Sequence, residues 1–181
     1  MECLDITLTK LIKTGIGIAE WKMILWEICF GLGVAQKHYG FIHNDLHSDN
    51  IMFKSCDTEF KYYQYQDKYY KVPTFGRETK VIDFARGIIK VGNKTYFSDV
   101  FKKEGDAGGQ YNYLQKQKNK KYNFSFDLAR LSTTIEEFIQ NSGESQDLYS
   151  FVKAWSINKQ GNSFFDMEDD FSLYVSIAES A

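Results

Sequence analysis

The stretch from Glu20 to Tyr39 constrains the fold most, because it combines a helical period with apolar residues on nearly every side. One apolar set recurs at steps of three and four, the spacing of a helix face: Trp21, Ile24, Leu25, Ile28, Leu32 and Ala35. A second set makes the other faces apolar: Met23, Trp26, Cys29, Phe30 and Val34. Gly40 predicts the end of this helix, since glycine readily takes the left-handed conformation of a C-cap. A helix that is apolar all round is a buried helix, so the rest of the chain must build a core around it.

Composition is typical of a single globular domain. Of the 181 residues, 43% are hydrophobic and 25% are charged, and the formal net charge is −2. This charge gives no general basis for binding nucleic acid, and the longest apolar run, Ile28 to Ala35, is far too short to cross a membrane. Three cysteines cannot form a disulfide framework, which favours reduced thiols and a cytoplasmic location, and no signal peptide is visible. We therefore expect no nucleic acid and no membrane among the partners.

Shorter patterns predict an α+β chain that is mainly helical. Apolar pieces anchor both ends of a polar loop at 43–50, and loose alternation predicts a β-hairpin within 57–72. Residues 80–84 resemble a short strand that ends in an acid. Residues 85–124 lack periodicity and carry four lysines between 116 and 121, which predicts a long exposed loop. Further helices are expected from about Ser125 or Asp127, over about 146–155, and from about Glu168 onward with Phe171, Tyr174, Val175 and Ala178 on one face.

The sharpest chemical signal is the loop sequence HNDLHSDN, which runs from His43 to Asn50. Phosphoryl transfer needs a carboxylate that orients the attacking hydroxyl and oxygen ligands for the magnesium ion on the nucleotide. Asp45, Asn50 and Asp83 supply these groups if the loop and the strand end at 80–84 lie close together. An alternative is a zinc or iron site made of His43, Asp45 and His47, which leaves Asn50 and Asp83 without a role.

This arrangement resembles the protein-kinase superfamily, whose catalytic loop reads H-R-D-x-x-x-x-N and whose metal-binding aspartate lies in D-F-G. The second motif here is Asp83-Phe84-Ala85, and FDLARL at Phe126 to Leu131 is similar to the central helix of the kinase C-terminal lobe. Among kinases, the chain looks most like the divergent serine/threonine kinases of large DNA viruses. The resemblance covers nearly the whole chain. It implies a C-terminal lobe without its N-terminal lobe, and the host cytoplasm or the virion as the location if the source is viral.

The resemblance also implies where the functional segments and residues lie. The domain over 1–181 is expected to contain a catalytic loop (43–50), a hairpin insertion (57–72), a metal motif (83–85), an activation-segment-like loop (86–124) and a helical subdomain (125–181). The implied cofactors are ATP and Mg²⁺. The implied roles are Asp45 as the catalytic residue, Asn50 and Asp83 as metal ligands, the backbone of Glu2 and Leu4 on adenine, Met52 beneath the adenine ring, His47 on phosphate or substrate, and His43 and Asp127 as structural support.

The departures from the kinase pattern keep other functions open. Met1 to Leu4 resemble the hinge between the two lobes, so the Gly-rich loop and nucleotide-binding lysine of the N-terminal lobe are expected from a partner or a longer chain. Asn44 stands where kinases usually carry arginine, and Ala85 replaces the glycine of D-F-G. The expected activity is ATP-dependent phosphorylation of protein Ser/Thr hydroxyls by a truncated kinase. The alternatives are an inactive pseudokinase or interaction module, and a small-molecule kinase of the choline or aminoglycoside type, which HND and His47 favour. The oligomeric state is left open.

Overall fold

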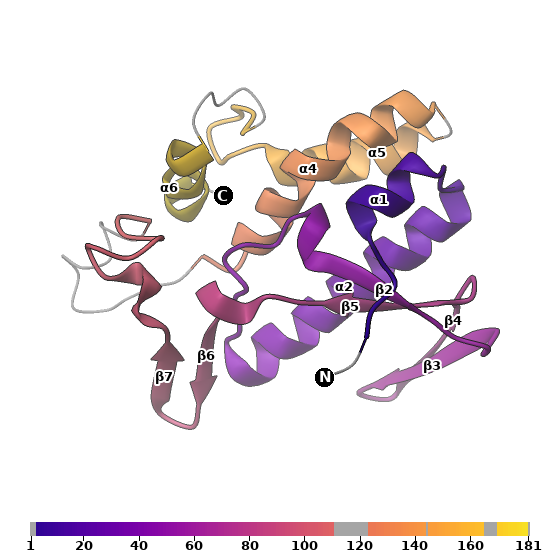
Figure 1. The fold of residues 1–181 in the computed structure, drawn as a ribbon, viewed down its shortest axis with the longest axis horizontal. Helices are drawn as coiled ribbons and strands as arrows, with labels where there is room; N and C mark the ends of the chain where they lie inside the picture. The colour runs from indigo at the N-terminus through magenta and orange to yellow at the C-terminus, as the bar shows by residue number, and fades with distance from the viewer. Residues whose placement is uncertain (1–2, 111–122, 144, 165–169, 181) are drawn as a thin grey trace.

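The computed structural model describes residues 3–110, 123–143, 145–164 and 170–180, and these form helices packed on small antiparallel sheets (Figure 1). Within these ranges no helix is both long and apolar enough to span a bilayer. The elements in chain order are β1 (Ile6–Thr7), α1 (Leu8–Lys13), α2 (Ile18–Tyr39), η1 (Ser48–Asn50), β2 (Ile51–Ser55), β3 (Phe60–Tyr65), β4 (Lys68–Pro73), β5 (Arg77–Val81), η2 (Phe84–Arg86), β6 (Ile88–Val91), β7 (Lys94–Phe97), η3 (Asp99–Phe101), α4 (Phe126–Ser142), α5 (Gln146–Lys153), η4 (Ala154–Ser156) and α6 (Asp170–Ser180).

The long helix α2 lies in the larger core, as its sequence predicts, but only one side of it is fully buried. The buried side consists of Trp21, Met23, Ile24, Leu25, Ile28 and Leu32. On the other side, Trp26 and Phe30 are half-buried beneath aromatic residues of the β3–β4 hairpin. The Trp26 and Tyr63 rings lie 5.0 Å apart, and the Phe30 and Tyr70 rings lie 5.8 Å apart. The predicted end is confirmed, because Gly40 closes the helix with a φ of 50°.

A three-stranded antiparallel sheet in the order β1-β2-β5 positions the two candidate motifs. Strands β2 and β5 pair from Ile51 opposite Val81 to Ser55 opposite Arg77. The loop at 43–50 precedes β2, and Asp83 follows β5. Antiparallel pairing therefore brings the end of the loop and the Asp83 segment to the same edge of the sheet. A hydrogen bond of 3.0 Å from the Ile82 amide to the Asn50 carbonyl oxygen continues the pairing beyond the strands.

The hairpin expected within 57–72 is confirmed as β3 and β4, joined by a two-residue turn at Gln66 and Asp67. It is inserted between β2 and β5. Its strands place Tyr63 and Tyr70 against α2, whereas Tyr62 and Tyr69 on the opposite face are exposed. The hairpin thus covers an apolar side of α2 that the main sheet does not reach.

A second, smaller core joins α6 to the centre of the molecule. Helix α4 belongs to both cores, because Leu131 and Ile135 lie in the larger core while Phe126 and Ala129 lie in the smaller one. The other buried members of the smaller core are Ile42, Ile88, Phe164, Leu173, Tyr174, Ile177 and Ala178. Packing on α4 therefore holds α6 beside the start of the candidate catalytic loop at Ile42.

The segment predicted as one long exposed loop, 85–124, is partly regular. It begins with η2 and continues into the β6–β7 hairpin, and Ile88 pairs with Ile42 as an isolated antiparallel bridge. Each strand has four residues and is largely exposed, so neither shows the alternation that marks a half-buried strand. The lysines at 116–121, Glu2, and residues Asp166, Glu168 and Asp169 before α6 lie outside the described residues.

Candidate functional site

The carboxylate of Asp127 holds the start of the candidate catalytic loop. It accepts hydrogen bonds of 2.9 Å from the amides of both His43 and Asn44, one on each oxygen. All three side chains are inaccessible to solvent. Burial raises the pKa of Asp127, while the two amide donors and the neighbouring His43 ring counteract that rise. Such contacts suit the structural role that the kinase resemblance implies for Asp127.

The ring of His43 connects the loop to the segment that carries Asp83. Its Nε2 lies 2.8 Å from the carbonyl oxygen of Ile82, so Nε2 carries the proton and donates. The ring is buried beside Phe41 and Phe84, with centroids 6.4 and 5.4 Å away. His43 therefore connects the two motifs, and its buried position does not suit a proton-transfer residue.

Two residues with left-handed backbone shape the motifs. Asn44 has a φ of 64° and Asp83 a φ of 60°, a conformation that asparagine and aspartate tolerate better than other non-glycine residues. The side-chain nitrogen Nδ2 of Asn44 donates to the carbonyl oxygen of Arg86 at 3.0 Å, and the Asp83 carboxylate accepts from the backbone N–H of Ala85 at 3.3 Å. The asparagine at position 44 is thus suited to both its backbone conformation and its contact.

Asn50 is oriented by the loop that it closes. Its Nδ2 donates to the carbonyl oxygen of Asp45 at 2.9 Å and lies 3.1 Å from Nε2 of His47. Because a carbonyl oxygen can only accept, the atom of the Asn50 side chain that faces Asp45 must be the nitrogen. The other atom, Oδ1, is therefore the one that could bind a cation. The pKa of His47 is lowered, mainly by burial. The negative charge of Asp45 opposes this shift, and the positive charge of Arg130 adds to it.

The donor set suits magnesium better than zinc or iron. Among the described residues, no three His, Cys, Asp or Glu side chains are grouped so that they could hold a metal ion, which removes support for the alternative site at His43, Asp45 and His47. Asp83 and Asn50 offer two hard oxygen donors on neighbouring segments. This number fits Mg²⁺, which usually takes one or two protein carboxylates or amides and completes its shell with water and phosphate oxygens.

The positions predicted to bind adenine are only partly described. Glu2 lies outside the described residues, and Leu4 is half-buried just before β1. Met52 is half-buried on β2, on the opposite face from Ile51 and Phe53, which point into the core. Met52 therefore lies on the outward face of the sheet, and the adenine-binding roles of these residues stay predictions.

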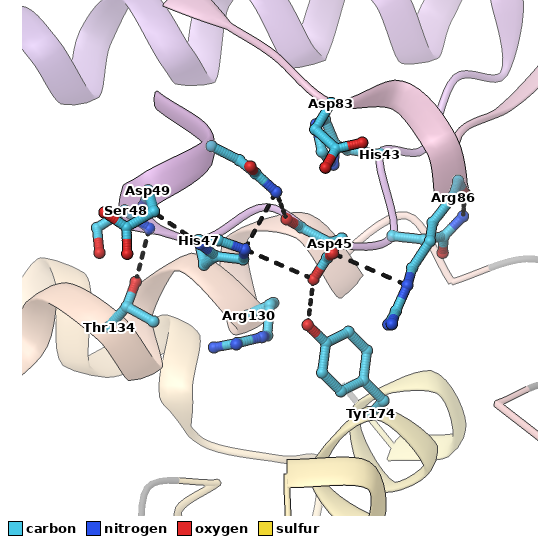
Figure 2. Close-up of polar contacts among 12 residues, drawn as sticks. His43, Asp45, His47, Ser48, Asp49, Asp83, Arg86, Arg130, Thr134 and Tyr174 are labelled. Carbon is cyan, nitrogen blue, oxygen red and sulfur yellow. Dashed lines mark hydrogen bonds and ion pairs between the residues drawn. The ribbon is translucent and has the colours of Figure 1, made fainter. Parts of the chain in front are cut away.

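Sequence reasoning missed three residues around Asp45. The hydroxyl of Tyr174 on α6 donates to Oδ1 of Asp45, and Nε of Arg86 lies 3.8 Å from Oδ2 (Figure 2). The guanidinium carbons of Arg86 and Arg130 lie 4.8 and 5.1 Å from the centre of the Tyr174 ring. Burial is the main cause that raises the pKa of Tyr174. The proximity of Arg86 to the metal motif could have marked it, but no local signal marks Tyr174.

Comparison with known proteins supports a kinase-like relationship over parts of the chain. A probable serine/threonine-protein kinase of Dictyostelium discoideum is 39% identical over 51 residues, which are 28% of this chain. The serine/threonine-protein kinase haspin of Bos taurus is 30% identical over 108 residues, or 60% of this chain. An Acanthamoeba polyphaga mimivirus protein assigned as a serine/threonine-protein kinase is 36% identical over 87 residues, or 44% of this chain. No protein-family model matches the chain.

The matches cover only part of each relative. The aligned stretches span 4%, 14% and 22% of the length of the Dictyostelium, bovine and mimivirus proteins. These matches support a kinase-like relationship at the level of the family only. The mixed helix-and-strand fold is compatible with that relationship. The activity, substrates and partners of the relatives belong to longer proteins.

Proposed function

We propose that this chain is the C-terminal lobe of an ATP- and Mg²⁺-dependent phosphotransferase that acts on protein Ser/Thr hydroxyls. One observation carries the proposal. The Asp45 loop is held at its start by Asp127 and at its end by the Asn50 amide, and His43 ties it to the Asp83 segment. This bracing orders a carboxylate and an amide oxygen at one edge of the sheet, where phosphoryl transfer needs them.

Each residue has a role in this proposal. The Asp45 carboxylate orients the acceptor hydroxyl and takes its proton, while Asn50 Oδ1 and the Asp83 carboxylate hold the metal. Bound Mg²⁺ would neutralise part of the charge of the nucleotide phosphates. His47 is half-buried beside Asp45, and this burial lowers its pKa, which favours the neutral ring. We assign it to contact with phosphate or acceptor.

The proposal requires a second lobe. Electrostatic stabilisation of the transferring group is usually the largest catalytic contribution, and a nucleotide-binding lysine and phosphate loop are expected from a further segment or a partner chain. We therefore expect the 181-residue chain by itself to bind ATP weakly and to transfer phosphate well below the roughly 1–100 s⁻¹ typical of kinases. The partners in this proposal are that lobe and a protein substrate.

A transfer assay tests the proposal. The protein is tagged and isolated from its natural source with any segments or partners that accompany it, and is incubated with γ-labelled ATP, Mg²⁺ and a mixed Ser/Thr peptide library. We expect labelled peptides, and a loss of about 10²–10⁴ in rate for Asp45→Asn, the range for a general base. The matched control is Asp49→Asn, an exposed aspartate of the same loop, which should retain the rate.

Other outcomes identify the alternatives. If no peptide is labelled but choline or an aminoglycoside is, the chain belongs to a small-molecule kinase and the acceptor in our proposal is wrong. If nothing is labelled and Asp83→Asn leaves the binding of Mg²⁺ and ATP unchanged, the proposal fails. The chain is then better described as an inactive pseudokinase or interaction module.

A further inference from the structure

Tyr174 lies in the small core while its hydroxyl reaches the candidate catalytic residue. The side chain is 8% exposed, and its ring centre lies 5.9 Å from that of Phe126. Its neighbours on α6, Leu173 and Ile177, are also buried in this core. Because packing holds the ring, the position of the hydroxyl is set by the fold of α6 on α4 and not by a mobile surface side chain.

Three polar side chains lie around the Asp45 carboxylate at different distances. The hydroxyl of Tyr174 makes a hydrogen bond to Oδ1. His47 Nε2 is 3.9 Å from the same oxygen, and Arg86 Nε is 3.8 Å from Oδ2. Both distances are too long for a hydrogen bond, although the charge of Arg86 still attracts the carboxylate. Tyr174 is therefore the group that fixes the orientation of the carboxylate.

The arginines strengthen this contact. Arg86 and Arg130 place their guanidinium groups over the Tyr174 ring, an arrangement in which a cation is attracted to the aromatic face. Burial raises the pKa of Tyr174 despite the nearby charge of Arg130, so the phenol keeps its proton and can donate it to Asp45. The ring is thus held by its packing and by two cations, and its hydroxyl is directed at Oδ1.

We propose that Tyr174 is a positioning residue for Asp45, so that the C-terminal helix α6 completes the catalytic loop. Its catalytic consequence rests on the phosphotransferase function proposed above. An ionised carboxylate has about four lone-pair sites. One bond from Tyr174 therefore leaves room for the acceptor hydroxyl and fixes the direction from which that hydroxyl approaches.

The first test measures the state of Asp45 without relying on activity. Tyr174→Phe keeps the ring, its packing and its contacts with the arginines but removes the hydroxyl. Carboxyl groups are activated with a carbodiimide, captured with glycine ethyl ester and quantified by mass spectrometry. We expect Asp45 to be labelled several-fold faster in the variant, because Oδ1 loses its donor. Labelling of the exposed Asp99 should not change, and neither should that of Asp45 in Tyr39→Phe, a control at an exposed tyrosine.

The second test separates positioning from blocking. In the peptide-transfer assay, Tyr174→Phe should lower kcat about tenfold or more while KM for ATP stays the same, since small misplacements of a catalytic group are costly. A higher kcat would show that the hydroxyl occupies the acceptor's place, which overturns the proposal. Unchanged labelling of Asp45 in a variant that melts cooperatively also overturns it. If the unmodified protein transfers no phosphate, the proposed function fails, and the labelling result still decides whether Tyr174 holds Asp45.

Discussion

Substitution of Asp127 by asparagine should destabilise the fold more than the same change at Asp45. Both Asp127 oxygens accept backbone N–H groups at 2.9 Å. An asparagine side chain offers one oxygen and one NH₂ group, so in either orientation a nitrogen faces an amide donor. One hydrogen bond is lost, and a buried N–H is left without an acceptor, at a cost of about 1–3 kcal/mol for the unpaired group.

The expected loss lies near the middle of that range. The neutral amide avoids the cost of burying a charge, which is the main cause that raises the pKa of Asp127. We therefore expect the free energy of unfolding to fall by about 2 kcal/mol. For a domain of 150–250 residues, 1 kcal/mol corresponds to about 2–4 °C in Tm, so the variant should melt about 4–8 °C lower.

Thermal melts followed by circular dichroism measure this effect. Asp45→Asn is the comparison, because its remaining oxygen can still accept from Tyr174 and its side chain is not enclosed by backbone donors. That variant should melt within about 2 °C of the unmodified chain, a change of under about 1 kcal/mol. If Asp45→Asn is the more destabilising of the two, the division into a structural Asp127 and a catalytic Asp45 is wrong.

Two further predictions concern the titration of half-buried groups. Burial raises the pKa of the Cys29 thiol from 9.0 to about 11, so its thiolate population at pH 8 is about a hundredfold below that of an ordinary thiol. Iodoacetamide should therefore modify Cys29 far more slowly than the exposed Cys3, as measured by mass spectrometry. Equal rates would contradict the burial argument. Burial lowers the pKa of His47 below 6.5 in the folded chain. Just below pH 6.5 the unfolded chain therefore binds more protons than the folded chain does. The contribution of His47 to the free energy of unfolding is complete above pH 6.5 and is lost as the pH falls. His47→Gln should consequently show a smaller drop in Tm between pH 7 and pH 5 than the unmodified chain, whereas identical drops would show that other groups cause the acid loss.

Local sequence was sufficient for the parts of the site that lie within one loop or one pair of strands. The loop from His43 to Asn50 carries its own spacing. The β3–β4 hairpin was also predictable, since its strands are long enough to show alternation. These features depend on short-range patterns that survive without a structure.

The missed features depend on distant packing or on weak local signals. Tyr174 contacts Asp45 from a position 129 residues further along the chain, and its sequence neighbourhood resembles any helix with an apolar face. Strands β6 and β7 have four residues each and little burial, so their pattern could not be told from a loop. The sequence predicts that α2 is buried on every side, because composition cannot show which element covers each side or how fully.

The placement of the β3–β4 hairpin has a consequence for how this protein could diverge. The insertion leaves and rejoins the sheet at register partners, because Ser55 pairs with Arg77 and the next residues, Cys56 and Gly76, share a hydrogen bond of 2.9 Å. The inserted segment between Cys56 and Gly76 therefore begins and ends at neighbouring positions of the sheet. Its length can change without moving the loop before β2 or the motif after β5. Lineages could therefore lengthen, shorten or exchange this segment as an independent module, provided that the replacement still covers Trp26 and Phe30 on α2.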